Sequence, residues 1–127
     1  MQVKNHHVAV ICSDIQRSER WWCDVLGLRV ARREYREARR SWKVDLENDS
    51  GVRIELFTFE GAPARPSYPE AMGLRHVAFE VGDVGAMVRR VESLGVKVEP
   101  VRVDAATGKR FTFFADPDGL PVEIYEA

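Results

Sequence analysis

The chain is poor in cysteine and has no long apolar run. Its 127 residues include two cysteines, Cys12 and Cys23, which are too few for a disulfide framework. Both lie in partly apolar segments, so we expect buried or half-buried side chains without a functional role. No segment approaches the length of a membrane span, and the first residues lack the apolar core of a signal peptide. These absences predict a cytoplasmic protein without a membrane partner.

The chain also has no excess of charge of either sign. Its 19 Lys and Arg residues balance 20 Asp and Glu residues, for a net charge of -1. This balance argues against nucleic acid or an acidic membrane as the main partner. Hydrophobic residues make up 45% of the sequence, which is enough for a packed core and too many for disorder. A chain of this length fits one domain and not two.

The two halves of the sequence repeat one another. His7-Val-Ala-Val is followed by Asp14, and His76-Val-Ala-Phe is followed by Asp83 at the same spacing. The same register, to within one residue, relates the Leu-Gly pairs at 26–27 and 94–95, Gly51 and Gly119, and Glu55 and Glu123. The sequence therefore predicts one domain, residues 1–127, built by tandem duplication. Module 1 spans about residues 4–60, a proline-containing linker spans 61–73, and module 2 spans 74–127.

Each module is predicted to contain a strand, a helix and three further strands. Apolar alternation over residues 7–12 predicts the first strand, and Asp14 is expected to cap the helix that ends at Gly27. Asp83 and Gly95 are the equivalent residues of the second helix. The remaining predicted strands span residues 29–35, 41–46, 52–59, 74–81, 96–103, 110–115 and 120–125. An α+β fold is expected.

Two of the three histidines occupy equivalent positions in the repeat. His7 and His76 lie on the predicted first strands, and Glu55 and Glu123 lie in otherwise apolar last strands, where an unpaired charge would be costly. If the modules pack symmetrically, two imidazoles and two carboxylates converge, a set that suits nickel, cobalt, zinc, manganese or iron. His6 has no counterpart, because position 75 is Arg, and strand alternation predicts that it points to the opposite face from His7.

The hairpin before Glu123 gives candidates for substrate binding. A two-residue turn at Pro117 and Asp118 would place Thr112 opposite Glu123. The residues predicted to share the face of Glu123 are then Arg110, Thr112, Phe114 and Tyr125. By the repeat offset, those predicted to share the face of Glu55 are Trp42, Val44 and Phe57. An aromatic cup with a nearby cation suits a small anionic organic substrate, although Arg110 is equally compatible with a solvated charge at a strand end. The residues predicted to bind substrate are therefore Arg110, Thr112, Trp42, Phe57 and Tyr125.

These residues resemble the vicinal oxygen chelate superfamily, which includes glyoxalase I and the bleomycin-resistance proteins. The resemblance rests on His7-Val-Ala-Val with Asp14, on residues 73–79 around His76, and on Asp-Pro-Asp-Gly-Leu-Pro-Val-Glu at 116–123. It implies paired βαβββ modules that form half-barrel sheets around a metal cup. The stretches at residues 35–43 and 110–114 look closest to a small bacterial glyoxalase-like subfamily. In the glyoxalase I branch, the ligand positions correspond to His7, Glu55, His76 and Glu123.

The resemblance implies a lactoylglutathione lyase-like enzyme that is a homodimer. Its substrate would be a small thiol–aldehyde adduct, such as the hemithioacetal of methylglyoxal with glutathione, and it would act through a metal-stabilised enediolate. Glu123 is the expected catalytic base and Glu55 the alternative. Other metalloenzymes of the superfamily (epimerases, dioxygenases and thiol transferases) remain open. A non-enzymatic drug-binding resistance protein is disfavoured, because such proteins generally lack the ligands.

Overall fold

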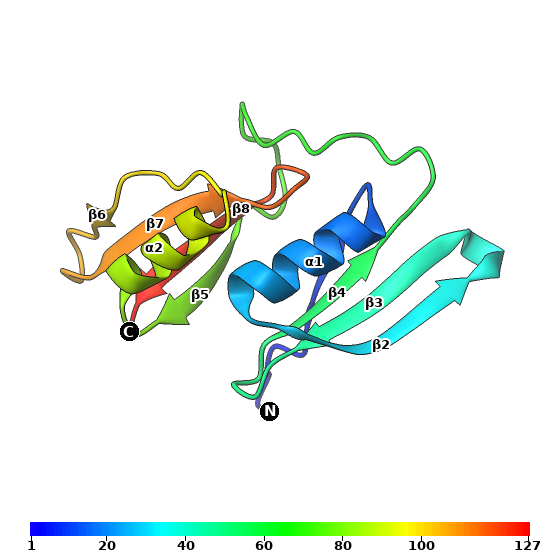
Figure 1. Ribbon diagram of the computed structural model, residues 1–127, viewed down its shortest axis with the longest axis horizontal. Helices are drawn as coiled ribbons and strands as arrows, with labels where there is room; N and C mark the ends of the chain where they lie inside the picture. The colour runs from blue at the N-terminus through cyan, green and yellow to red at the C-terminus, as the bar shows by residue number, and fades with distance from the viewer. The chain divides into compact units, whose positions relative to one another are not determined.

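The computed structural model describes residues 1–127. The chain divides into two compact units, Met1–Pro63 and Ala64–Ala127, and the boundary falls inside the predicted linker. Each unit has a four-stranded mixed sheet and one α-helix, in the order strand, helix, strand, strand, strand (Figure 1). The predicted α+β fold with two βαβββ modules is therefore confirmed. Neither helix has the length and apolar character needed to cross a bilayer.

The first unit is built around a sheet with the order β1-β4-β3-β2. Strand β1 is parallel to β4, and the other neighbouring strands are antiparallel. Helix α1 packs on β3 and β4 (Figure 1). The elements are β1 (Val8–Ile11), α1 (Ile15–Leu26), β2 (Arg29–Arg36), the 3-10 helix η1 (Glu37–Arg39), β3 (Ser41–Glu47) and β4 (Arg53–Phe57).

Helix α1 has the predicted start and end. The Asp14 side chain accepts a hydrogen bond from the Arg17 amide, and Gly27 ends the helix at φ 70, a left-handed conformation that glycine adopts without a Cβ penalty. Trp22 on the inner side of the helix is fully buried, as is Leu56 on the sheet below it. Truncating a buried tryptophan costs about 3–5 kcal/mol, so this face of the sheet forms the core of the unit.

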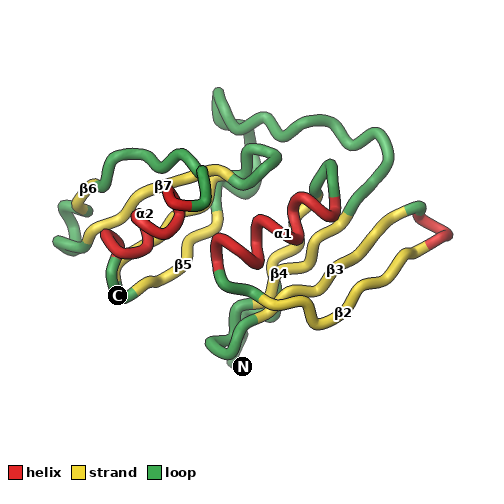
Figure 2. The backbone as a smooth tube through the Cα atoms, in the orientation of Figure 1, coloured by secondary structure: helices red, strands yellow, loops and turns green.

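The second unit repeats the arrangement with the sheet order β5-β8-β7-β6, and Figure 2 shows its strands in yellow and its helix α2 in red. Helix α2 packs on β7 and β8, and Asp83 caps it by accepting from the Ala86 amide. Its core includes Val84, Val91, Val122 and Ile124, all of them 0% exposed. The elements are β5 (Val77–Val81), α2 (Val84–Ser93), β6 (Arg102–Val103), β7 (Arg110–Ala115) and β8 (Pro121–Glu126).

Strand β6 is much shorter than the strand predicted over residues 96–103. Only Arg102 and Val103 pair with β7 as a ladder, and Val98 makes one isolated bridge to Phe114. Pro100 lies between them and has no amide hydrogen to donate, so it interrupts the ladder. In each unit, the sheet face opposite the helix is covered by no helix of that unit; we call it the open face.

Candidate metal and substrate site

His7 and Glu55 lie on the open face of the first unit. In the parallel β1–β4 register Ala9 pairs with Glu55. His7 precedes β1, and its contact with Glu55 places its ring on the same face. The Nε2 atom of His7 is 3.5 Å from Oε1 of Glu55. The side chain of Glu55 is 18% exposed, so the pair is partly shielded but still reachable from solvent.

His76 and Glu123 form the same pair in the second unit. Ala78 pairs with Glu123 in the parallel β5–β8 register, and His76, which precedes β5, contacts Glu123 on the open face. The distance between His76 Nε2 and Glu123 Oε1 is again 3.5 Å, and the Glu123 side chain is 15% exposed. The structure thus brings the four predicted ligand residues together as two equivalent His–Glu pairs, one in each unit.

Each pair has a geometry that suits two ligands of one metal ion. Nitrogen and oxygen ligands lie about 2.1 Å from a metal such as zinc. Two donors at that distance and 3.5 Å apart subtend roughly 110° at the ion, close to a tetrahedral angle. In neither unit is a group of three or more His, Cys, Asp or Glu side chains gathered as a metal site. Each unit therefore holds two of the four predicted ligand residues.

The two glutamates have different neighbours. In the first unit Lys43 Nζ lies 3.9 Å from Oε1 of Glu55, and Asp45 is the cross-strand partner of Glu55. In the second unit the cross-strand partner of Glu123 is Phe113, whose ring stacks edge-on with His76 at 5.0 Å. The carboxylate of Glu55 is thus shared with an ammonium, whereas Glu123 lies against an aromatic ring.

His6 contacts His7, contrary to the prediction that the two histidines point to opposite faces. Their Nδ1 atoms are 2.9 Å apart, and their rings pack edge-on at 5.2 Å. Arg53 Nη1 lies 3.1 Å from the other ring nitrogen of His6. The alternation argument was wrong because β1 begins at Val8, so neither histidine belongs to the regular strand.

The turn before β8 has three residues, not the predicted two. The Asp116 amide donates to the Leu120 carbonyl, and Gly119 lies between them at φ 87. This loop with a final left-handed glycine is a common three-residue hairpin connection. The extra residue shifts the pairing by one, so Phe113 faces Glu123 and Thr112 faces Ile124. Because side chains alternate between faces, the predicted set of neighbours on β7 was wrong.

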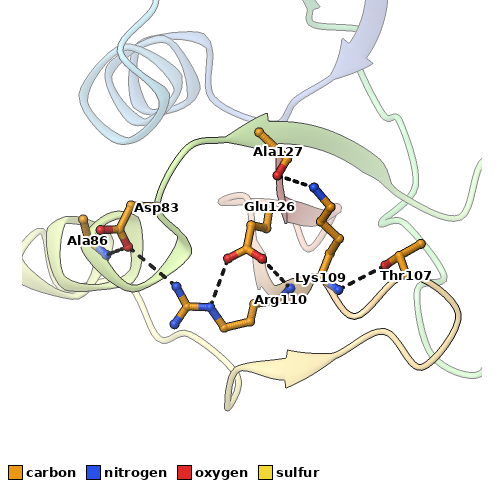
Figure 3. A network of polar contacts seen from close by, with 7 residues as sticks. All are labelled: Asp83, Ala86, Thr107, Lys109, Arg110, Glu126 and Ala127. Carbon is orange, nitrogen blue, oxygen red and sulfur yellow. Dashed lines mark hydrogen bonds and ion pairs between the residues drawn. The ribbon is translucent and has the colours of Figure 1, made fainter.

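Thr112 and Arg110 therefore lie on the helix side of the sheet. Thr112 is 0% exposed, and its hydroxyl donates to the Glu99 carbonyl at 2.7 Å. Arg110 Nε donates to Glu126 at 3.2 Å, and its Nη2 lies 4.0 Å from Asp83 at the start of α2 (Figure 3). The hydrogen bonds that the Arg110 side chain and backbone donate, together with the Arg110 charge, lower the pKa of Glu126. Both residues have structural partners, which removes the geometric basis for a substrate-binding role.

Tyr125 does share the open face with Glu123, two residues away on β8. Its hydroxyl donates to Asp104 Oδ2 at 2.9 Å and contacts the hydroxyl of Thr107. The Thr107 hydrogen bond lowers the pKa of Tyr125, but desolvation, the hydrogen bond to Asp104 and the charges of Asp104 and Glu123 outweigh it, and the net shift is upward. The phenol therefore stays neutral and holds the loop between β6 and β7.

In the first unit, Phe57 lies on the face of Glu55 and Trp42 does not. The β3–β4 register pairs Lys43 with Phe57 and Asp45 with Glu55, so Trp42 and the buried Val44 belong to the helix side. The Trp42 amide donates to the Thr58 hydroxyl at 2.9 Å. Of the five residues predicted to bind substrate, only Phe57 and Tyr125 lie beside a candidate ligand.

Sequence reasoning missed the residues that do line the open faces near the His–Glu pairs. These are Lys43 and Asp45 in the first unit and Arg75, Phe111 and Phe113 in the second. The signal was present in Gly119, because a glycine at the third loop position favours the three-residue turn. The same shift follows in the first unit, where the Asn48 amide donates to the Val52 carbonyl.

Comparison with known proteins agrees with this architecture. The chain is 54% identical over 121 residues to the uncharacterised protein YaeR of Escherichia coli, covering 95% of this chain and 94% of YaeR. It is 49% identical to the uncharacterised protein YwkD of Bacillus subtilis, with the same coverage. A crystal structure of a glyoxalase family protein from Enterococcus faecalis superposes with a TM-score of 0.90, at 43% identity over 97% of both chains. A family model described as the glyoxalase/bleomycin resistance protein/dioxygenase superfamily matches residues 4–124, and the chain belongs to that superfamily.

Proposed function

We propose that the protein is a metal-dependent lyase or isomerase of the glyoxalase I type. The observation that supports the proposal is the His–Glu pair that recurs with the same 3.5 Å separation on the open face of both units. One pair supplies too few ligands for a catalytic metal, and two pairs supply four. Membership of a superfamily that includes glyoxalases supports the same reading.

His7, Glu55, His76 and Glu123 would hold one divalent ion together. Two imidazoles and two carboxylates favour nickel, cobalt or zinc and also accept manganese or iron. When bound, such an ion supplies Lewis-acid stabilisation of the negative charge that develops on two adjacent substrate oxygens. We expect a small-molecule substrate, the hemithioacetal formed by methylglyoxal and a thiol such as glutathione.

Glu123 is the better candidate for the residue that moves the proton between neighbouring substrate carbons. A general base needs a carboxylate that is free to leave its other partners. Glu55 Oε1 lies 3.9 Å from Lys43 Nζ, which competes for its lone pairs. Glu123 faces the Phe113 ring, and its polar contact is with the His76 ring, at 3.5 Å. Its carboxylate is thus held only by groups that belong to the proposed site.

Metal analysis of purified variants tests the proposal. The wild-type protein should retain about one divalent ion per four-ligand set, and His76→Ala and Glu55→Gln should each lower the metal content. Glu80→Gln is the matched control, because Glu80 pairs with Tyr125 on the same open face and has no histidine partner. Full metal content in both ligand variants, with an unchanged circular dichroism spectrum, would show that these residues are not ligands.

An activity assay then separates the glyoxalase function from other metal chemistry. The nickel-loaded and zinc-loaded proteins are incubated with methylglyoxal and glutathione, and consumption of the hemithioacetal is followed. Turnover that disappears in His76→Ala and persists in Glu80→Gln is the expected result. Stoichiometric metal without turnover on this or related thiol–aldehyde adducts would reject the glyoxalase assignment and keep the metal site.

A further inference from the structure

The open faces of the two units differ in chemical character. In the first unit Lys43 lies 3.3 Å from Asp45 and 3.9 Å from Glu55, so its charge is balanced within the face. In the second unit the cross-strand partner of Glu123 is Phe113. Phe111, two residues earlier on β7, lies on the same face. The charged groups on the open face of the first unit thus pair with each other. On this aromatic face the neighbours of Glu123 are rings, so a charged ligand can bind without displacing such a pair.

Arg75 lies at the edge of this aromatic face, beside the candidate ligand His76. Its Nη1 atom is 3.1 Å from His76 Nδ1, and its guanidinium lies 5.9 Å from the centre of the Phe113 ring. Its carboxylate partner is Glu70, at 4.0 Å, beyond hydrogen-bond distance. A guanidinium carries five N–H donors, so most of the donors of Arg75 are not committed to a charged acceptor.

The backbone of Arg75 is held in place by the linker. Arg65 Nη2 donates to the carbonyls of Leu74 and Arg75, at 2.6 and 3.0 Å. Arg65 Nε donates to the Ser67 hydroxyl, and that hydroxyl donates to the Gly119 carbonyl at 2.7 Å. The linker is therefore tied to the turn before β8, and the position of Arg75 relative to that turn is fixed by four hydrogen bonds.

A small open cavity lies between the linker and the sheet at this point. Its volume is about 50 Å³, and its lining residues are Ser67, Tyr68, Glu70, Arg75, Glu99, Phe113 and Pro121. A water molecule needs roughly 10–15 Å³ by the same measure, so the cavity accommodates a group the size of a carboxylate. Of its two acidic residues, Glu99 is already bonded to Arg102 at 3.1 Å. Glu70 is the one acid that is loosely paired.

We propose that Arg75 and this cavity form a subsite for a carboxylate group of the substrate. The planar guanidinium matches a carboxylate in a bidentate arrangement, and Glu70 is the weakly held counter-ion that the ligand replaces. The subsite rests on the proposed function in one respect: it places the carboxylate next to His76 and therefore next to the reacting part of a metal-held substrate. The substrate class is thus narrowed to carboxylate-bearing adducts.

Malonate binding to the chelator-treated full-length protein tests the subsite without a metal. Malonate is titrated while the side-chain Nε–H signals of the arginines are followed by NMR, and the Arg75 signal should shift. Charge-assisted hydrogen bonds predict an affinity about ten- to a hundred-fold lower in Arg75→Gln. Removing the competing acid in Glu70→Gln should raise the affinity by up to about five-fold, the size of an exposed ion pair. Arg102→Gln removes an equal charge that also lies near the Phe113 ring, at 5.6 Å, and should leave the affinity within about two-fold, because Arg102 is already paired with Glu99.

A nickel-loaded sample connects the subsite to the metal. Acetohydroxamate and the monohydroxamate of malonic acid carry the same two-oxygen chelating group, and only the second adds a carboxylate. The carboxylate compound should bind about tenfold more tightly to the wild type and lose that advantage in Arg75→Gln. Equal binding of both compounds, or malonate binding that survives Arg75→Gln, overturns the subsite. If neither compound binds, the metal function is wrong, and the malonate titration still decides the subsite.

Discussion

Replacing Asp116 by asparagine is expected to keep the turn before β8 and to remove a buried charge. The Oδ1 atom of Asp116 accepts hydrogen bonds from the amides of Asp118 and Leu120, at 2.9 and 2.8 Å. Its Oδ2 atom is buried without a hydrogen-bond partner. Asn48 is the equivalent residue of the first unit, and its Oδ1 accepts from the amides two and four positions later, at 3.0 Å each. The chain thus shows that an amide supports this turn.

The loss of folding free energy in each variant depends on which backbone amides lose their acceptor. Asp116→Ala leaves the buried Leu120 amide unpaired, which costs about 1–3 kcal/mol, and it also removes the bond from Asp118, so the total is about 2–4 kcal/mol. Asp116→Asn keeps both bonds and should stay within about 1 kcal/mol of the wild type. Asn48→Ala should cost only about 1 kcal/mol, because Asn48 is less buried and water can replace the lost acceptor.

The pH dependence has a definite sign. Burial raises the pKa of Asp116 above its ordinary value of 3.8, and the hydrogen bonds from Leu120 and Asp118 oppose that shift only in part. A carboxyl whose pKa is higher in the folded state stabilises the fold fully below its unfolded pKa, and this contribution is lost as the pH rises through the folded pKa. The stability of Asp116→Asn relative to the wild type should therefore increase from pH 3 upward through the acidic range.

The assay must report on the second unit. The three tryptophans, Trp21, Trp22 and Trp42, all lie in the first unit, so tryptophan fluorescence would miss the change. Hydrogen exchange of the Leu120 amide, together with urea unfolding followed by far-ultraviolet circular dichroism, reports on β8 directly. Asp116→Ala that is as stable as Asp116→Asn, or an Asn variant whose relative stability falls with rising pH, would refute the reasoning.

Three further predictions concern the proposed site and the cysteines. Glu123→Gln should retain metal, because an amide oxygen still coordinates, and lose about a hundred- to ten-thousand-fold in turnover; near-normal turnover with a dead Glu55→Gln would reverse the two roles. Each sheet ends in two edge strands that pairing of modules would cover, so we expect a homodimer. Mixing His7→Ala with Glu123→Gln chains should restore turnover if each site joins module 1 of one chain to module 2 of the other, and restore none if each site lies within one chain. Burial, Glu19 and Asp24 raise the pKa of Cys23 against the opposing effect of Arg33, so alkylation by iodoacetamide at pH 7 should be slower than that of free cysteine, and a rate equal to or above it would contradict this assignment.

The repeat and the order of elements could be predicted because they depend on local signals. Asp14 and Gly27 mark the start and end of α1, and their chemistry acts within a few residues. Each His–Glu pair forms as well, although the predicted hairpin register was wrong. A histidine at the first strand and a glutamate on the last strand meet through a parallel pairing, and that pairing is independent of the hairpin turn.

The neighbours of the pairs could not be predicted because they depend on one residue of register. A two-residue loop after Asp116 would put Thr112 beside Glu123, whereas the three-residue loop of the structure puts Phe113 there. A slip of one residue moves every side chain of β7 to the other face. The repeat offset transfers the same one-residue shift to the first unit, so the prediction for Trp42 is wrong and Lys43 occupies that face. Gly119 at the third loop position favours the three-residue turn, but the same sequence is also compatible with a two-residue turn at Pro117 and Asp118.

Arg75 shows why a repeat can hide a functional residue as well as reveal one. The duplication directed attention to positions that match, and Arg75 matches His6, a residue of different chemistry. At its position each of these residues has a ring nitrogen of the neighbouring histidine within hydrogen-bond distance. His6 is an imidazole linked onward to Arg53, whereas Arg75 is a cation that faces a cavity and an aromatic ring. If both units bind the same metal and only one of them binds the rest of the substrate, the two units must differ at a position near the metal. The proposed asymmetric substrate would therefore be distinguished by Arg75 and His6, the residues that differ between the two units, each next to a histidine that the repeat keeps.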